Sequence, residues 1–180
     1  MLAASHLRLM ATYNEWMNAR LYTAASTLPH EQLCLERGAF FGSILRTLNH
    51  IVVGDTIWLK RFATHPAGYA QLDPVRALPY PASLKEAAFA DLPSLAERRT
   101  MLDAVTIDWC AAISEPDLDH ILHYANTSGV VSDKRFFSLV MHFFNHQTHH
   151  RGQVTTMLSQ AGVDVGVTDL LAVIPNEPTA

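Results

Sequence analysis

Residues 141–153 read MHFFNHQTHHRGQ and contain four of the ten histidines of this 180-residue chain. The run lies within a segment of helical apolar spacing, which predicts an amphipathic helix from about residue 133 to 161, with Gly162 as its C-terminal stop. Its apolar stripe is interrupted in the two middle slots by Gln147 and His150. At about 100° per residue, His146 and His150 stand one turn apart on one face, where two side chains can share a partner. The stretch therefore predicts a long packed helix that carries half of a metal site.

Three further segments are expected to form long helices. Residues 5–28 and 43–63 show the three- and four-residue spacing of packed helix seams, and the second of them is so apolar that we expect it to be buried on most sides. A third helix is predicted from about residue 83 to 113. Its expected start is the SLKE motif of residues 83–86, which has the form of a capping box, and an interruption or bend is expected near Pro93.

The segments between these helices complete the predicted fold. Residues 65–82 contain four prolines and one glycine, which indicates a long connection that leads the chain to the far end of the bundle. Residues 118–137 combine apolar residues with a central Asn-Thr-Ser-Gly sequence, which predicts a short β-hairpin or an extended loop. We therefore expect an all-α protein, a four-helix bundle with a long crossover connection and a short β-hairpin before the last helix, in a single domain over residues 1–180.

Composition excludes several classes of function. The formal net charge of −4 provides neither the basic surface that nucleic acid requires nor a polybasic face for an anionic membrane. No apolar run approaches the roughly 18 residues of a membrane span. Cys34 and Cys110 lie far apart, which suits a reducing compartment better than a disulfide framework. Residues 1–8 lack the features of a signal peptide. The expectation is a soluble cytoplasmic protein that binds neither nucleic acid nor membrane.

A third metal ligand is expected from the apolar helix of residues 43–63. His50 lies in this buried segment, and an imidazole buried without a polar partner is costly. Gly54 follows one turn later and leaves space beside the ring. If the two helices are neighbours, His50, His146 and His150 converge on one ion, as metal sites in bundle cores do.

Four blocks of sequence, in the right order, resemble the DinB family. They are residues 13–21 (YNEWMNARL), residues 43–50 (SILRTLNH) with Asp55 and Trp58, residues 146–153 (HQTHHRGQ) and residues 168–171 (TDLL). The resemblance implies a four-helix bundle that holds a divalent metal through three histidines, which here are His50, His146 and His150. It also implies a homodimer, because many members form one. Relatives in the wider superfamily use the metal to activate low-molecular-weight thiols such as bacillithiol or mycothiol.

Three imidazole ligands determine what such a centre can do. Structural zinc sites are usually closed by four protein ligands, whereas a site with three leaves a position for water or substrate. Imidazole suits several divalent metals, of which we expect zinc or nickel. We expect a metal-dependent enzyme that activates a thiol or water nucleophile, with thiol S-transfer preferred and hydrolysis next. The alternative is a non-catalytic metal-binding or structural protein related to stress, which a fourth protein ligand such as His142 would favour.

Other polar residues have less specific interpretations. His142 and His149 are expected to be bystanders of the ligand pair, and His120 and His123 flank the predicted hairpin. Asn14 and Asp55 occupy packed helix seams. They are expected to belong to a buried hydrogen-bond network, with Arg151 or Gln153, rather than to orient a ligand imidazole.

Overall fold

The computed structural model describes residues 3–176, and most of them are helical. Four long helices form the bundle: α1 (Ala3–Ala25), α3 (Ile44–Phe62), α5 (Leu92–Ala112) and α6 (Phe136–Gln160). The shorter elements are α2 (His30–Cys34), α4 (Asp73–Arg76), the 3-10 turns η1 (Ala70–Leu72), η2 (Pro116–Asp119) and η3 (Leu170–Val173), and the strands β1 (Ile121–Ala125) and β2 (Val131–Arg135). The predicted helical bundle with a hairpin before the last helix is confirmed.

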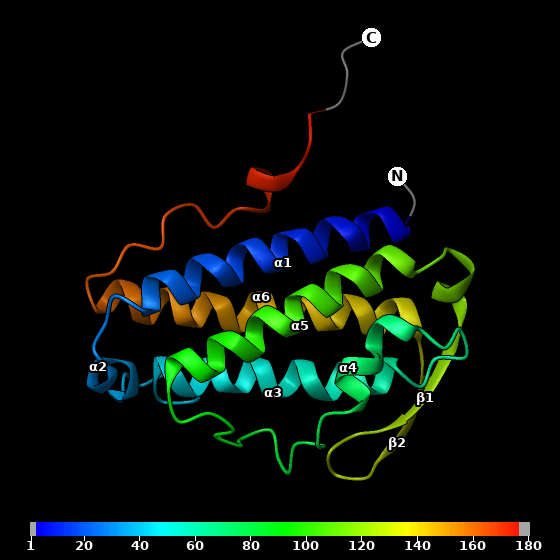
Figure 1. Cartoon of the computed structure of the whole chain (residues 1–180), viewed down its shortest axis with the longest axis horizontal. Coiled ribbons are helices and arrows are strands. Elements are labelled where there is room, and N and C mark those ends of the chain that lie inside the picture. The colour runs from blue at the N-terminus through cyan, green and yellow to red at the C-terminus, as the bar shows by residue number, and fades with distance from the viewer. Residues whose placement is uncertain (1–2, 177–180) are drawn as a thin grey trace.

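The long connection between α3 and α5 determines the topology. Figure 1 shows that α3 and α5 run in the same direction, so the chain returns along the length of the bundle between them. Helix α6 runs antiparallel to both, and α1 lies over α5 and α6. The crossover brings residues 78–90 alongside α3 as an irregular segment, which we call the strap. The strap forms one wall of the cavity at the candidate site.

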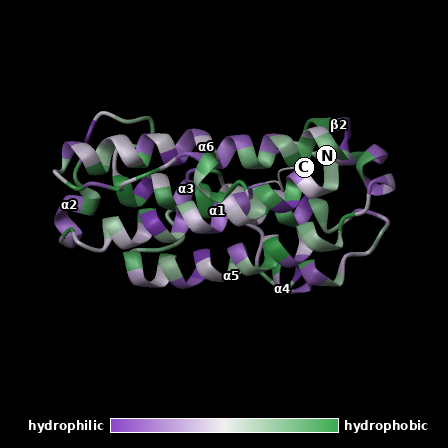
Figure 2. Ribbon diagram, turned by 90° about the horizontal axis from the view of Figure 1, so that it is seen from above, coloured by the Kyte–Doolittle hydropathy of each residue, from purple (hydrophilic) through white to green (hydrophobic). Residues whose placement is uncertain are grey.

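The core is built from the apolar stripes of the four long helices. Figure 2 shows hydrophilic and hydrophobic residues alternating around each of them, as in amphipathic helices. The predicted stripe of α6 is buried throughout, from Phe136 to Met157. At the hairpin end, Phe62 stacks on Trp109 with ring centroids 5.0 Å apart, and Phe143 meets Phe62 edge-on. No helix of residues 3–176 combines the length and hydropathy needed to cross a membrane.

Helix α3 has the bounds and the burial that the sequence predicts. It begins after Ser43, whose Oγ accepts a hydrogen bond from the backbone N–H of Arg46 at 3.3 Å. Its polar side chains Asn49, His50 and Asp55 are buried together with the apolar ones. Because α3 packs against both α5 and α6, most of its circumference is covered.

The third long helix begins at Leu92, and its predicted start at residue 83 is wrong. Asp91 is the N-cap, and its carboxylate accepts from the backbone N–H of Ser94 at 2.8 Å. Pro93 therefore lies in the first turn, where its missing N–H costs nothing, and it does not bend the helix. Glu86 still reaches back, to the backbone N–H of Ala82 at 2.6 Å, but this contact closes a turn within the strap.

Two other helix ends differ from the predicted ones by three residues. Helix α1 ends at Ala25, where the hydroxyl groups of Ser26 and Thr27 bond to carbonyls of its last turn. Helix α6 begins at Phe136 because residues 133–135 pair with β1. Gly162 adopts a φ of 79° directly after α6, as expected of a helix stop.

Candidate metal centre

The three histidines singled out in the sequence meet between α3 and α6. One ring nitrogen from each of His50, His146 and His150 lies within 4.8 Å of the other two, which is the spacing of a site that can hold a metal ion. The Nε2 atoms of His50 and His146 are 3.1 Å apart. The expected convergence of one side chain from α3 and two from α6 is therefore found.

Hydrogen bonds on the outer ring nitrogens determine which nitrogen can bind a metal. Nδ1 of His50 lies 2.9 Å from the carbonyl oxygen of Leu84 in the strap, and a carbonyl can only accept. Nδ1 of His50 therefore carries the hydrogen, and Nε2 presents a lone pair to the centre. His150 is held likewise, since its Nδ1 lies 2.9 Å from Oε1 of Gln153, whose amide nitrogen is directed to His149. Two of the three rings are thus held in the form that ligates through Nε2.

Gly54 makes room for this arrangement. A Cβ atom at residue 54 would lie 3.0 Å from Cε1 of His146, closer than ordinary van der Waals contact. The sequence predicts space beside His50 at this position, and the ring that uses the space is that of His146. The glycine thus lets α3 and the imidazole of α6 approach each other closely.

The electrostatics of the cluster favour neutral imidazoles. Burial, followed by the neighbouring His150 and His50, lowers the pKa of His146 to about 3. The pKa values of His50 and His150 are also lowered, and burial is the main cause for both. Near neutral pH the three rings therefore present lone pairs without needing to lose protons. Three neutral nitrogen donors suit a divalent ion such as zinc or nickel, so the residues present fit the expected metal.

The remaining histidines of α6 lie outside this group. His142 is exposed and packs edge-on against Trp58, with ring centroids 5.1 Å apart, while its distance to His146 is 6.0 Å. His149 is exposed and contacts Gln153. Among residues 3–176 no fourth histidine, cysteine or carboxylate completes the cluster.

The histidines of the hairpin region also lie apart from the centre. His123 pairs with Asp133 across the two strands, at the surface. His120 approaches the buried His65, with ring centroids 4.6 Å apart, a contact that sequence spacing did not indicate.

A buried polar network connects the four long helices beside the centre. Arg99 of α5 pairs with Asp55 of α3 and, at 2.9 Å, with Asp103. Asp103 also accepts a hydrogen bond from Asn14 of α1 at 3.1 Å, and the Asn14 oxygen accepts from Arg151 of α6. The expected network around Asn14 and Asp55 is present and includes Arg151. Gln153 bonds to His150 instead, and Arg99 and Asp103 were not anticipated from the sequence.

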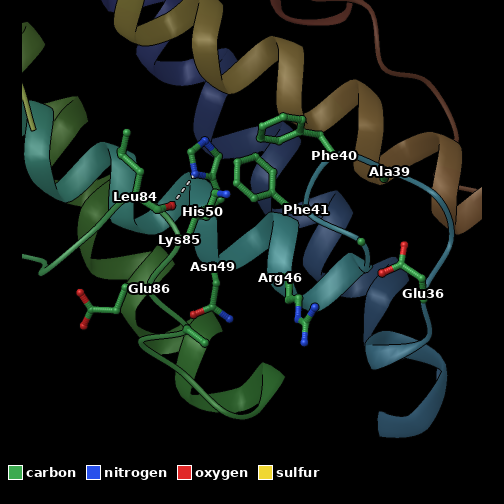
Figure 3. A pocket seen from close by; sticks show the side chains of 12 residues that line it. Glu36, Ala39, Phe40, Phe41, Arg46, Asn49, His50, Leu84, Lys85 and Glu86 are labelled. Atoms are coloured by element: carbon green, nitrogen blue, oxygen red, sulfur yellow. Dashed lines mark hydrogen bonds between the residues drawn. The ribbon is translucent and has the colours of Figure 1, made fainter. Parts of the chain in front are cut away.

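A cavity of about 400 Å³ lies against His50. Figure 3 shows it between the strap, α3 and the loop that precedes α3. The ring of Phe41 stacks on that of His50 at 3.8 Å and meets His150 edge-on at 5.5 Å, so one aromatic ring borders both the cavity and two of the histidines. The other lining side chains include Phe40, Arg46, Asn49, Leu84 and Lys85.

Comparison with known proteins agrees with the resemblance of the sequence. The sequence model of the DinB family matches residues 1–178. Protein DinB of Bacillus subtilis (strain 168) is 28% identical over 158 residues, which cover 87% of this chain and 87% of that protein. No solved structure matches the chain significantly.

Proposed function

This chain belongs to the DinB family, and we propose that it is a metal-dependent enzyme whose centre consists of His50, His146 and His150. The observation that carries the proposal is the convergence of three buried or half-buried ring nitrogens, two of them fixed by acceptors on their outer nitrogens. Outer hydrogen bonds of this kind orient metal-ligating histidines and raise their basicity.

A divalent ion held there, zinc or nickel, would supply Lewis-acid chemistry and lower the pKa of a coordinated water or thiol toward neutrality. The protein's part is to hold three neutral imidazoles in place, and because residues 3–176 add no fourth ligand to the cluster, room is left for a reactant. The cavity touches His50, one of the three histidines, and would give that reactant a route to the centre.

Transfer of a low-molecular-weight thiol to an electrophile is the preferred reaction, and hydrolysis is the next. The aromatic wall of Phe40 and Phe41 suits an organic substrate, because moving an apolar group from water onto this wall lowers the free energy. We further propose a cytoplasmic homodimer in which each chain is a single domain.

The first test separates metal binding from folding. We expect His150→Ala to lose stoichiometric zinc or nickel while its far-UV circular dichroism remains that of the wild type. His142→Ala, which changes an exposed imidazole of the same helix that packs against Trp58, is the matched control and should keep the metal. Full metal retention by His150→Ala would refute the assignment of the ligands.

The second test addresses catalysis. Wild-type protein loaded with metal is incubated with a panel of electrophiles and several small thiols, with and without excess chelator. Turnover that disappears with chelator and in His150→Ala supports the enzyme. Metal binding that raises the melting temperature, without turnover of any thiol or ester substrate, would favour the non-catalytic structural role.

A further inference from the structure

We propose that the cavity beside His50 is a substrate subsite that binds the carboxylate group of a small organic molecule through Arg46 and Lys85. The inference deepens the proposed function, on which it rests for the role of the metal: the histidine centre carries out the reaction, and the cavity selects the substrate.

The position of Arg46 follows from the helix that also carries His50. The two residues are four apart in α3, so their side chains are neighbours on one face, with Cβ atoms about 6 Å apart. Arg46 and His50 therefore line the same cavity, and Figure 3 shows the guanidinium of Arg46 directed away from the ring of His50, so a ligand held by Arg46 would extend toward the centre from there. Lys85 approaches from the opposite wall, next to Leu84, whose carbonyl holds the ring of His50.

The two walls are fixed relative to each other. Asn49 donates from its side chain to the carbonyl of Phe89 at 3.0 Å and accepts from the N–H of Phe89 at 2.9 Å. This pair of bonds ties the strap to α3 at the floor of the cavity. Hydrogen bonds thus hold the cavity open. The backbone that carries its cationic side chains needs little rearrangement when a ligand binds.

The cations of the cavity lack partners, whereas its carboxylates have them. Within residues 3–176, neither Arg46 nor Lys85 forms an ion pair or a side-chain hydrogen bond. Glu36 bonds to the backbone N–H of Gly38 at 2.9 Å and fills the space where a side chain on Gly42 would stand.

The second carboxylate, that of Glu86, bonds to the backbone N–H of Ala82. Figure 3 shows it directed away from Arg46 and Asn49. The groups that remain for a ligand are a guanidinium and an ammonium, which are complementary to an anion.

The balance of charge favours a carboxylate over a phosphate. Two cations and two carboxylates line the cavity. A single negative charge placed between Arg46 and Lys85 is attracted by both. For a phosphate, with a charge near −2, the attraction to the two cations and the repulsion from the two glutamates both double, whereas the cost of removing the ion from water rises with the square of its charge.

The rest of the ligand is expected to be apolar and small. Phe40 is 78% exposed and packs edge-on against Phe41, so the cavity has an aromatic wall that solvent now covers. A volume of about 400 Å³ lies at the lower end of the range for small-molecule sites. An aromatic or aliphatic acid of modest size satisfies both observations.

The test uses 3-phenylpropionate and its neutral isostere 3-phenylpropionamide, with binding measured by calorimetry. The proteins are the wild type, Arg46→Gln, Lys85→Gln and, as a charge-matched control from the exposed hairpin, Lys134→Gln. Each is measured with zinc and after chelation. We expect the acid to bind the wild type about tenfold more tightly than the amide, since hydrogen bonds between charged partners are worth about that factor. Arg46→Gln and Lys85→Gln should each remove most of this preference, while Lys134→Gln keeps it.

Equal affinity for acid and amide, the absence of binding, or an acid preference that survives both substitutions would overturn the proposal. The chelated samples separate this result from the fate of the proposed function. If the histidines hold no metal but the acid preference remains and depends on Arg46, the subsite stands and the metal enzyme does not. If metal-dependent turnover is found without any acid preference, the enzyme stands and the subsite is wrong.

Discussion

Replacement of Gly54 by alanine should separate the stability of the bundle from its capacity to bind metal. Gly54 lies in the interior of α3, where alanine is intrinsically better than glycine by about 1 kcal/mol. The new Cβ, however, would lie 3.0 Å from Cε1 of His146, whereas carbon atoms in contact normally stay about 3.5–4.0 Å apart. The imidazole must therefore move by roughly 0.5–1 Å, beyond the displacement of about 0.5 Å that a preorganised site tolerates.

The expected loss of zinc affinity is about tenfold or more, comparable to the loss of a hydrogen bond that orients a ligand. In the metal-free protein the helix propensity and the displaced ring oppose each other, so we expect a net stabilisation smaller than 1 kcal/mol or none. Gly152→Ala is the matched control. Gly152 lies in α6 close to His150, but apart from the backbone of its own helix no atom lies within 4 Å of the place that its Cβ would take. This variant should gain the full propensity term and leave zinc affinity unchanged.

Two measurements decide the outcome. Urea unfolding of the chelated proteins gives their free energies of unfolding, and competition with a chromophoric chelator gives their zinc affinities. The reasoning is refuted if Gly54→Ala binds zinc as tightly as the wild type and is stabilised as much as Gly152→Ala. That result would mean that the ring of His146 does not depend on the space above Gly54.

Three further predictions concern the groups around the centre. Gln153→Leu removes the acceptor of His150 Nδ1 and should lower zinc affinity about tenfold or more, measured by the same competition; unchanged affinity would show that this contact does not hold the ring. Arg99→Met leaves two buried carboxylates without their cation and should cost about 3–5 kcal/mol in urea unfolding. Arg98→Met, which changes a half-buried arginine of the same helix, is the control and should cost about 1 kcal/mol or less. Equal costs for the two variants would contradict the stabilising role of Arg99 in the buried network. Because burial and two neighbouring imidazoles hold the pKa of His146 at about 3, against 6.5 for the free side chain, the unfolded chain binds more protons between these values. The free energy of unfolding of the chelated protein should therefore rise as the pH increases from about 3 to 6.5, and the contribution of His146 to it should fall away as the pH is lowered through this window. His146→Gln should reduce the slope of unfolding free energy against pH. Identical slopes in the variant and the wild type would contradict the lowered pKa of His146.

The convergence of His50, His146 and His150 could be predicted partly from helical geometry and partly from the resemblance to the DinB family. The spacing of His146 and His150 is set by one helix, and the apolar surroundings of His50 identify a buried face. Gly54 added a local reason for close packing. Each of these signals lies within one segment, so they are visible in the sequence before the helices are assembled.

The strap could not be predicted in the same way. The SLKE motif of residues 83–86 describes a pattern of side-chain-to-backbone bonds that fits a helix start, and a turn uses part of the same pattern. Asp91 and Pro93 provide a competing start eight residues later, and the structure uses that one. The position of the strap against α3 depends on contacts such as that of Asn49 with Phe89, which link residues distant in the sequence.

The buried network was only half predictable for a related reason. Asn14 and Asp55 were recognised because they interrupt apolar seams. Arg99 and Asp103 are also four apart and lie within the predicted helix of residues 83–113, but an ion pair of this spacing is equally typical of a solvated helix face, so it did not mark the two residues as buried. Which carboxylate pairs with which guanidinium is decided only where the four helices meet.

The hydrogen bond from His50 to Leu84 has a consequence for how this centre can vary. The acceptor is a main-chain carbonyl, so any residue at position 84 that preserves the path of the strap supplies the same oxygen. A scan of side-chain substitutions would pass over this position, while deletion of one residue from the strap would shift the oxygen along the chain by about 3.5 Å. The centre is thus tolerant of residue identity at position 84 and sensitive to the length of the strap. Insertions or deletions in the strap, more than point substitutions, would change the orientation of the His50 ring.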